Sequence, residues 1–376
     1  MKFVIPTQEL NFLINKCLNV ASGKSTIPIL SNFLIEAAND ELTITATDLT
    51  VGIRCFTDAK ILEEGATTLP AKRLAQLIRE LTALNVEVSA NSNEITDVVA
   101  DSSRFKLNGM SRNEFPSLPN MTGASQFRMK QAHLKEILFR TSFAVSREDN
   151  RYVLTGVYMH LANGKAIFAG TDGKRLSKTE IAVQIDPSFS GTFIIPLKAV
   201  EEVMKSLSDE GDVLIFLMND KIGFETTHLM LITKLLVGEY PDVNRVIPAQ
   251  SEIIVRLHRE ELMTLLRQIA LFTGETVTGS VRFAFTDGEL KLTANTMEVG
   301  EGKVSMPVNY QGPKLEIAFN PNYFLDILRH TKSQIITLGL TDTYNPGLIR
   351  EDKDGPQQPD EPDTLYVLMP MRLSEE

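Results

Sequence analysis

The chain has 376 residues, of which 43% are hydrophobic, and its 38 Lys and Arg against 48 Asp and Glu give a formal net charge of −10. No apolar run approaches the roughly 20 residues of a membrane-spanning helix, and Pro6, Gln8 and Glu9 interrupt the apolar N-terminus, which argues against a signal peptide. Cys17 and Cys55 follow apolar patterns without disulfide or metal spacing, which predicts a reducing, cytoplasmic compartment.

In chain order, the first predicted element is a short strand that enters an amphipathic helix, with apolar residues at i, i+3, i+4 and i+7. This pattern occurs at 3–22, 127–146 and 255–274. A second helical pattern beside a proline follows at 69–81, 195–207 and 319–331. Repetition on one period of about 125 residues predicts three copies of one module rather than two larger domains.

Between the two helices of each module, the apolar pattern changes to period 2. The alternating runs flank turn residues at Asn39-Asp40, Asn163-Gly164 and Asp287-Gly288. Such turns between alternating runs are a strong local signal for a β-hairpin. Each module is therefore predicted to be α+β, with a sheet on one side and two helices on the other.

Polar, proline-containing linkers near 116–125 and 241–250 separate the modules. The predicted domains are 1–122, 123–249 and 250–376. Within the third, the segment from Asp342 to Asp363 breaks the period, because it is rich in Pro, Gly and acidic residues and lacks apolar periodicity. This acidic insertion predicts an exposed, mobile loop that contributes nothing to a core and whose shortening leaves folding intact. A closing strand follows at 364–373.

Positive charge is concentrated on the predicted helices. Over the six helical windows 7–20, 70–84, 128–145, 196–207, 256–272 and 320–333, Lys and Arg exceed Asp and Glu by 7, which leaves −17 for the rest of the chain. If the helices share one surface, that surface is basic within an acidic protein, as a nucleic-acid interface requires. Solvated helix faces carry such charges as well, so the charge distribution alone leaves both interpretations open.

No constellation of catalytic residues stands out. The segment 21–26 resembles the end of a phosphate-binding loop, but Leu18 stands where its first glycine belongs, and a helix rather than a strand precedes it. The five histidines show no metal-ligand spacing. Asp48 and Asp172 recur at equivalent positions, where Asx turns are favoured over paired catalytic carboxylates. The sequence predicts a non-enzyme without metal or cofactor.

Three modules of this kind can form an arc with the helices on its concave face. The exposed edges at its two ends must be capped or paired with another copy, and a head-to-tail contact that closes gives a ring. A ring lined by Lys and Arg would hold duplex DNA by its phosphates without reading bases, and it could therefore slide.

Several motifs resemble the bacterial DNA polymerase III beta-subunit family, the sliding clamps. They are RYVLTG (151–156), TDGKRL (171–176), EYPDVNRVIP (239–248) and YVLMPMRL (366–373). The resemblance spans the chain apart from 342–363. It implies three DNA-clamp domains with outer sheets and inner helices, and a homodimeric six-domain ring that encircles double-stranded DNA. It also implies a processivity factor that binds the replicative polymerase alpha subunit, the clamp-loader delta subunit and other proteins with a clamp-binding motif.

Carried onto this chain, the family's partner-peptide groove is apolar with arginines at its rim. Some of its residues are also expected to be core residues, in particular Leu154 and Val367. The implied groove residues are Leu154, Thr171, Gly173, Arg175, Leu176, Pro241, Arg245, Val246, Val367, Leu368, Met369, Pro370, Met371 and Arg372. Lys174 stands where the family often has histidine, and its role stays open. The extension Ser374–Glu376 adds negative charge beside the groove.

The resemblance also implies DNA contacts and a subunit contact. The DNA-binding residues it implies are Lys24, Arg147, Tyr152 and Lys198, to which charge and helix position add Lys72, Arg73 and Lys205. At the subunit contact, Phe105 and Leu107 of one chain would meet Leu271 and Phe272 of the other. Two alternatives remain: a protein-interaction scaffold that uses the groove without enclosing DNA, and a metal-dependent hydrolase that uses Asp48 and Asp172.

Overall fold

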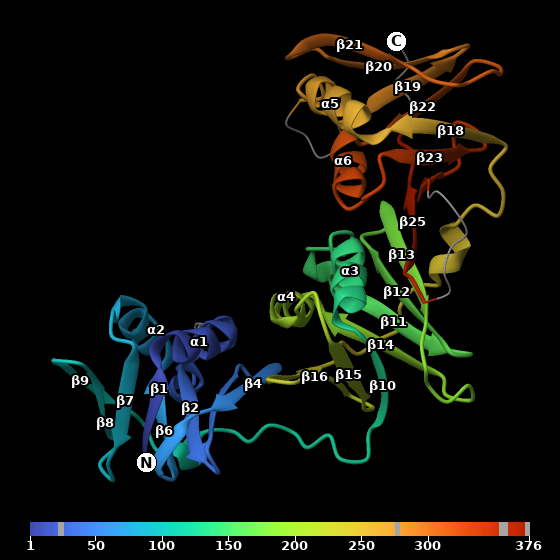
Figure 1. The fold of residues 1–376 in the computed structure, drawn as a ribbon. Coiled ribbons are helices and arrows are strands. Elements are labelled where there is room, and N and C mark those ends of the chain that lie inside the picture. The colour runs from blue at the N-terminus through green and yellow to red at the C-terminus, as the bar shows by residue number, and fades with distance from the viewer. Residues whose placement is uncertain (22–25, 275–278, 353–359, 373–376) are drawn as a thin grey trace. The chain divides into compact units, whose positions relative to one another are not determined.

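The computed structural model describes residues 1–21, 26–274, 279–352 and 360–372 (Figure 1). Within these ranges the chain forms six α-helices: α1 (Thr7–Ala21), α2 (Ala71–Glu80), α3 (Gln131–Ser142), α4 (Leu197–Ser206), α5 (Arg259–Ala270) and α6 (Pro321–Arg329). Each lies inside a predicted helical segment, so the helix predictions are confirmed. Among the described residues, no helix combines the length and apolar character needed to cross a membrane.

The strands form four antiparallel sheets, named A to D, and sheets A and B are built from residues 2–130 and 212–234. Sheet A has the order β5 (Lys60–Glu63), β1 (Lys2–Pro6), β7 (Asn85–Ala90), β8 (Ile95–Ala100) and β9 (Ser103–Asn108). Sheet B has the order β10 (Ser125–Lys130), β15 (Asp212–Leu217), β16 (Lys221–Thr226), β17 (Leu229–Lys234), β4 (Val51–Asp58), β3 (Glu41–Thr47), β2 (Asn32–Ala38) and β6 (Gly65–Pro70).

The other two sheets repeat this scheme. Sheet C has the order β14 (Gly191–Pro196), β11 (Gly156–Ala162), β12 (Lys165–Thr171), β13 (Arg175–Ala182), β25 (Asp363–Leu368), β24 (Gly347–Glu351), β23 (Ile335–Leu340) and β18 (Ile253–His258). Sheet D has the order β21 (Gly300–Pro307), β20 (Glu289–Thr296), β19 (Val281–Thr286) and β22 (Leu315–Phe319).

Sheets B and C each join strands from two successive sequence repeats. In sheet B, Leu231 of β17 lies opposite Ile53 of β4, and in sheet C, Val367 of β25 lies opposite Leu176 of β13. The chain accordingly divides into two compact units, one of 1–135 with 198–235 and one of 136–197 with 236–376. The central repeat contributes strands to both units, because hydrogen-bonded ladders run through the repeat boundaries.

The hairpins form at the predicted turns. Asn39 and Asp40 have φ values of 52° and 59°, and Asn163 and Gly164 have 53° and 71°. These left-handed conformations are the ones that two-residue hairpin turns require and that Asn, Asp and Gly tolerate best. At the third hairpin, Gly288 has φ 74°.

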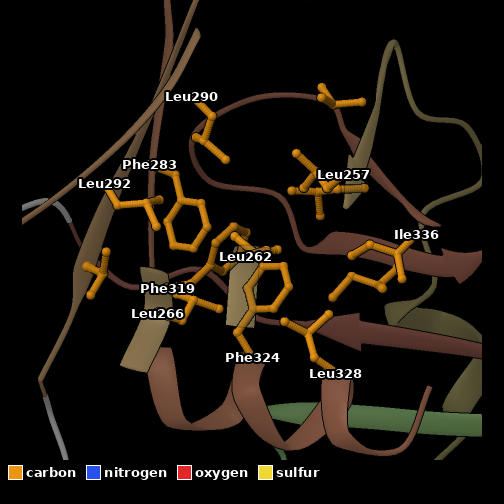
Figure 2. Packing of buried hydrophobic residues seen from close by; sticks show 14 of the residues in the cluster. Leu257, Leu262, Leu266, Phe283, Leu290, Leu292, Phe319, Phe324, Leu328 and Ile336 are labelled. Carbon is orange, nitrogen blue, oxygen red and sulfur yellow. The ribbon is translucent and has the colours of Figure 1, made fainter. Parts of the chain in front are cut away.

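Apolar helix faces pack on the sheets in both units. In the first, α1 packs against β3, β4 and α2, and both Cys17 and Cys55 are buried free thiols, as predicted. In the second, Figure 2 shows Leu262 of α5 and Phe324 of α6 converging with Phe283 of β19. Burying a side chain of this size contributes about 1.5–3 kcal/mol, so these faces fix where the helices lie.

The prediction of a loop at Asp342–Asp363 is wrong for the middle part of this segment. Residues Gly347–Glu351 form β24, which pairs with both β23 and β25, and Ile349 is fully buried. Leu348, Ile349 and Arg350 alternate between half-buried, buried and exposed positions on this one strand. The alternation is too short to predict a strand, because acidic and proline-rich sequence surrounds it. Residues 353–359 lie outside the described residues.

Replacing Ile349 with Ala should therefore destabilise the second unit. The expected loss in unfolding free energy is about 2–5 kcal/mol, because the substitution opens a cavity in the hydrophobic core against which sheet C packs. Tyr344→Ala is the matched control, since Tyr344 lies in the same segment and is 87% exposed. Denaturant unfolding of both variants checks this, and equal stability of the two would contradict a structural role for β24.

Candidate functional site

Part of the predicted groove forms one apolar cluster in the second unit. Leu154, Leu176 and Val367 pack with Tyr240 and Val243 of the second linker. Leu154 and Val367 are 5% and 1% exposed, which confirms that both are core residues. They form the floor of the site and leave its contact surface to other residues.

The exposed side of this site comes from the linker and the segment after β25. Val246 is 41% exposed and Met369 is 37% exposed, while the Arg245 side chain is 84% exposed. The Met369 N–H donates to the Lys174 carbonyl at 3.0 Å, and the Met371 N–H donates to the Ala318 carbonyl at 2.8 Å. The first bond holds the methionine segment beside the TDGKRL turn, and the second ties it to β22.

The turn itself depends on Asp172. Its Oδ1 accepts hydrogen bonds from the backbone N–H groups of Lys174 and Arg175, at 2.9 and 3.1 Å. Asp48 accepts from Val51 N–H in the same way, at 2.7 Å. Both aspartates thus form Asx turns, as favoured from the sequence, and each lies in the turn between two paired strands.

Arg175 is not the rim residue that the sequence predicted. Its side chain is 9% exposed, and its guanidinium donates to Asp172 Oδ2 at 3.1 Å, to Asp326 Oδ2 at 2.7 Å and to the Phe143 carbonyl at 3.1 Å. It also lies 4.7 Å from the Tyr323 ring centroid. Arg175 therefore ties β13 to α6 and the end of α3, and the exposed arginines of the site are Arg245 and Arg372. Sequence reasoning missed Asp326, because nothing local marks a partner so distant in the chain.

A second buried ion pair lies in the same unit. Arg140 Nη1 and Glu351 Oε2 are 2.9 Å apart, and both side chains are 5% exposed. Glu136 lies 2.9 Å from both Arg140 and Lys332. Burial raises the pKa of Glu351, but the hydrogen bond and charge of Arg140 outweigh it, so the net pKa is lowered.

The predicted DNA-binding residues differ in their availability. Lys72 and Arg73 are exposed on the first turn of α2, whereas Lys198 forms an ion pair with Asp48 and Lys205 lies 2.9 Å from Glu202. Burial would raise the Asp48 pKa, but the hydrogen bonds from Lys198 and the turn backbone lower it overall.

The remaining predicted DNA contacts lie elsewhere. Arg147 is exposed and Tyr152 is 56% exposed in the second unit. Lys24 and Ser374–Glu376 lie outside the described residues. Along the described ranges, no group of three or more His, Cys, Asp or Glu side chains is placed to hold a metal ion.

Of the residues predicted for subunit contact, two lie on an edge strand and two follow helix α5. Phe105 is 37% exposed on edge strand β9, where a pocket of about 480 Å³ lies between α2 and the β8–β9 turn and is lined in part by Leu77 and Leu81. Leu271 is 73% exposed just after α5, while Phe272 packs against the core of the second unit. Leu107 is half-buried.

Family models for the DNA polymerase III beta subunit match nearly the whole chain. The N-terminal domain model matches 1–119, the central domain model 128–242 and the C-terminal domain model 244–372. The chain is 52% identical to the beta sliding clamp of Chlamydia pneumoniae, with all of both chains covered. It is 31% identical to that of Pseudomonas aeruginosa, with 99% of this chain and all of the relative covered.

Two solved structures are similar throughout. The DNA polymerase sliding clamp of Bacillus subtilis superposes with a TM-score of 0.93 at 25% identity, with all of both chains covered. The Pseudomonas aeruginosa sliding clamp bound to griselimycin has a TM-score of 0.93 at 30% identity, with 99% of this chain and all of that chain covered.

Glu351→Gln should destabilise the protein in a pH-dependent way. At pH 7 we expect a loss of about 1–3 kcal/mol, because Arg140 stays buried with less compensating charge. Since the folded pKa of Glu351 is lowered, its charge stabilises above the unfolded pKa of about 4.3 and that contribution is lost on further acidification. The difference between variant and wild type should therefore shrink below about pH 4.

Urea unfolding across pH 3 to 7 measures this difference. Glu180→Gln is the control, because the Lys165–Glu180 pair is exposed and should contribute less than about 1 kcal/mol. A difference between Glu351→Gln and wild type that does not change with pH would show that the Glu351 charge has no stabilising role.

Proposed function

Since the chain belongs to the DNA polymerase III beta-subunit family, the sliding clamps of DNA replication, we propose that it acts as a head-to-tail homodimeric ring around duplex DNA. In this role it holds the replicative polymerase on its template as a processivity factor, without catalysing a reaction itself. The three repeats, 1–122, 123–249 and 250–376, are its clamp domains, six in the closed dimer.

The observation that supports the ring is a pair of open sheet edges, each with an exposed apolar side chain nearby. Edge strand β9 carries Phe105, which lines a pocket. Edge strand β21 packs against α5, and exposed Leu271 follows the last residue of that helix. Open edges pair readily with another chain. We propose that Leu271 and Phe272 of one chain contact the surface formed by Phe105 and Leu107 of the other. This contact would occur twice in a closed dimer.

DNA contact is assigned to exposed basic residues and to one tyrosine, all of which could contact phosphates. Lys72, Arg73, Arg147 and Tyr152 are exposed and free to approach a duplex, and Lys24 is retained from the resemblance. Lys198 and Lys205 would have to exchange Asp48 and Glu202 for phosphate, so their contribution is weaker. Contacts of this kind are sequence-independent and salt-sensitive.

The partner groove is assigned to the apolar site of the second unit. Buried Leu176 and Val367 form its floor, and Val246, Met369 and Arg245 form its exposed side. Methionine side chains adapt to different apolar partners, while a few fixed polar groups orient an extended peptide. The proposed partners are the replicative polymerase alpha subunit, the clamp-loader delta subunit and other proteins with a clamp-binding motif, all met in the cytoplasm.

Topology provides the first test of the ring. Clamps loaded on closed circular DNA should survive a wash at moderate salt, whereas clamps on the same DNA after linearisation should slide off its ends. Retention measured by gel filtration checks this, because linkage does not depend on screened phosphate contacts. Equal retention on both forms would contradict encirclement and favour a scaffold that never encloses DNA.

A Pseudomonas aeruginosa clamp has been solved with griselimycin bound, and we assign this ligand to the groove of the present chain and use it as a probe. Met369→Ala with Pro370→Ala should weaken griselimycin binding at least about tenfold, which corresponds to about 1.4 kcal/mol. Dimerisation measured by sedimentation should not change. Ile254→Ala is the control, since Ile254 is 64% exposed on edge strand β18, outside the groove. Undiminished binding by the double variant would mean that the groove is misplaced.

A further inference from the structure

The first linker crosses a surface that is equivalent to the groove. Register shows the equivalence, because Gly52 of β4 lies opposite Ile232 of β17, as Leu176 of β13 lies opposite Val367 of β25. The linkers begin alike, with Phe115-Pro116 and Tyr240-Pro241. Phe115 and Tyr240 also pack in matching clusters, with Leu30 and Leu154 respectively. The β4–β17 junction is thus a counterpart of the β13–β25 junction.

At the first junction, linker side chains fill notches left by two glycines. A Cβ placed on Gly52 would collide with a methyl carbon of Leu118, and a Cβ on Gly223 would collide with the sulfur of Met121. Met121 is 7% exposed. Side-chain volume from the linker therefore occupies space that strand side chains would otherwise take.

At the second junction, the strands carry the larger side chains and the linker carries the smaller ones. Leu176 stands where Gly52 stands, and Leu348 of β24, opposite Val367, stands where Gly223 of β16 stands, opposite Ile232. The linker residues at the places of Leu118 and Met121 are the smaller Val243 and Val246. Val246 remains 41% exposed, so this junction keeps an open apolar side.

The first linker depends on these side chains for its position. Pro116 and Pro119 have no N–H, and among the described residues the backbone of 116–120 makes no backbone hydrogen bond. The second linker, in contrast, forms a 3-10 turn at Val243–Val246, with Asp242 as its cap. The contacts of half-buried Leu118 with Gly52 and of buried Met121 with Gly223 are what keep the first linker on sheet B.

We propose that the first junction is a self-occupied counterpart of the partner groove, closed by Leu118 and Met121. Its occupant is the chain's own linker, and each chain therefore offers one apolar peptide site instead of two. This inference rests on the proposed groove at the second junction.

The test combines Leu118→Ala with Met121→Ala in the full-length dimer. Amide hydrogen exchange over 117–124 should accelerate at least about tenfold, because the linker loses its anchors. Calorimetric titration with griselimycin should rise from one to two equivalents per chain. Ser117→Ala, an exposed change in the same segment, should alter neither value.

Gly223→Ala provides a second route that removes no apolar side chain. Its methyl group should displace Met121 and accelerate exchange in the same segment. Unchanged exchange in both variants would overturn the anchoring, and faster exchange with a single griselimycin equivalent would overturn the counterpart site. Failure of the proposed groove is distinguishable, because it would already appear in the wild type as absent binding, or as binding unaffected by Met369→Ala with Pro370→Ala.

Discussion

The backbone ladders that join successive repeats are the constraint on which the rest of the structure depends. β4 pairs with β17 and β13 pairs with β25, so each eight-stranded sheet contains strands from two repeats. These antiparallel bonds fix the register of β13 and β25, which supply Leu176 and Val367 to one apolar cluster. The proposed groove would thus be a property of the junction, and neither repeat would form it alone.

Buried charge reinforces this junction in the second unit. Arg175 joins the β13 turn to Asp326, and Arg140 pairs with Glu351 of β24. A buried pair adds little net stability over apolar residues, but removing one partner is costly. Such pairs therefore specify one arrangement of α3, α6 and sheet C.

Much of this organisation could be predicted from the sequence, and the failures have physical causes. Helix periodicity and the hairpin turns at Asn39-Asp40 and Asn163-Gly164 are local signals, and all of them correspond to observed elements. β24 was missed because a five-residue strand inside acidic sequence has too little periodicity to detect. Arg175 was assigned to the rim because its contacts with Asp326 and Phe143 arise from tertiary packing, which local sequence does not encode.

The shared sheets also bear on how the protein can be divided. A fragment that ended at the first repeat boundary, residue 122, would lose β17 and leave the β4 edge with unpaired N–H and C=O groups. Open edges of this kind aggregate or swap strands. The sequence repeat is therefore a unit of duplication and not a unit of independent folding, and an isolated module would need a substitute strand to stay soluble.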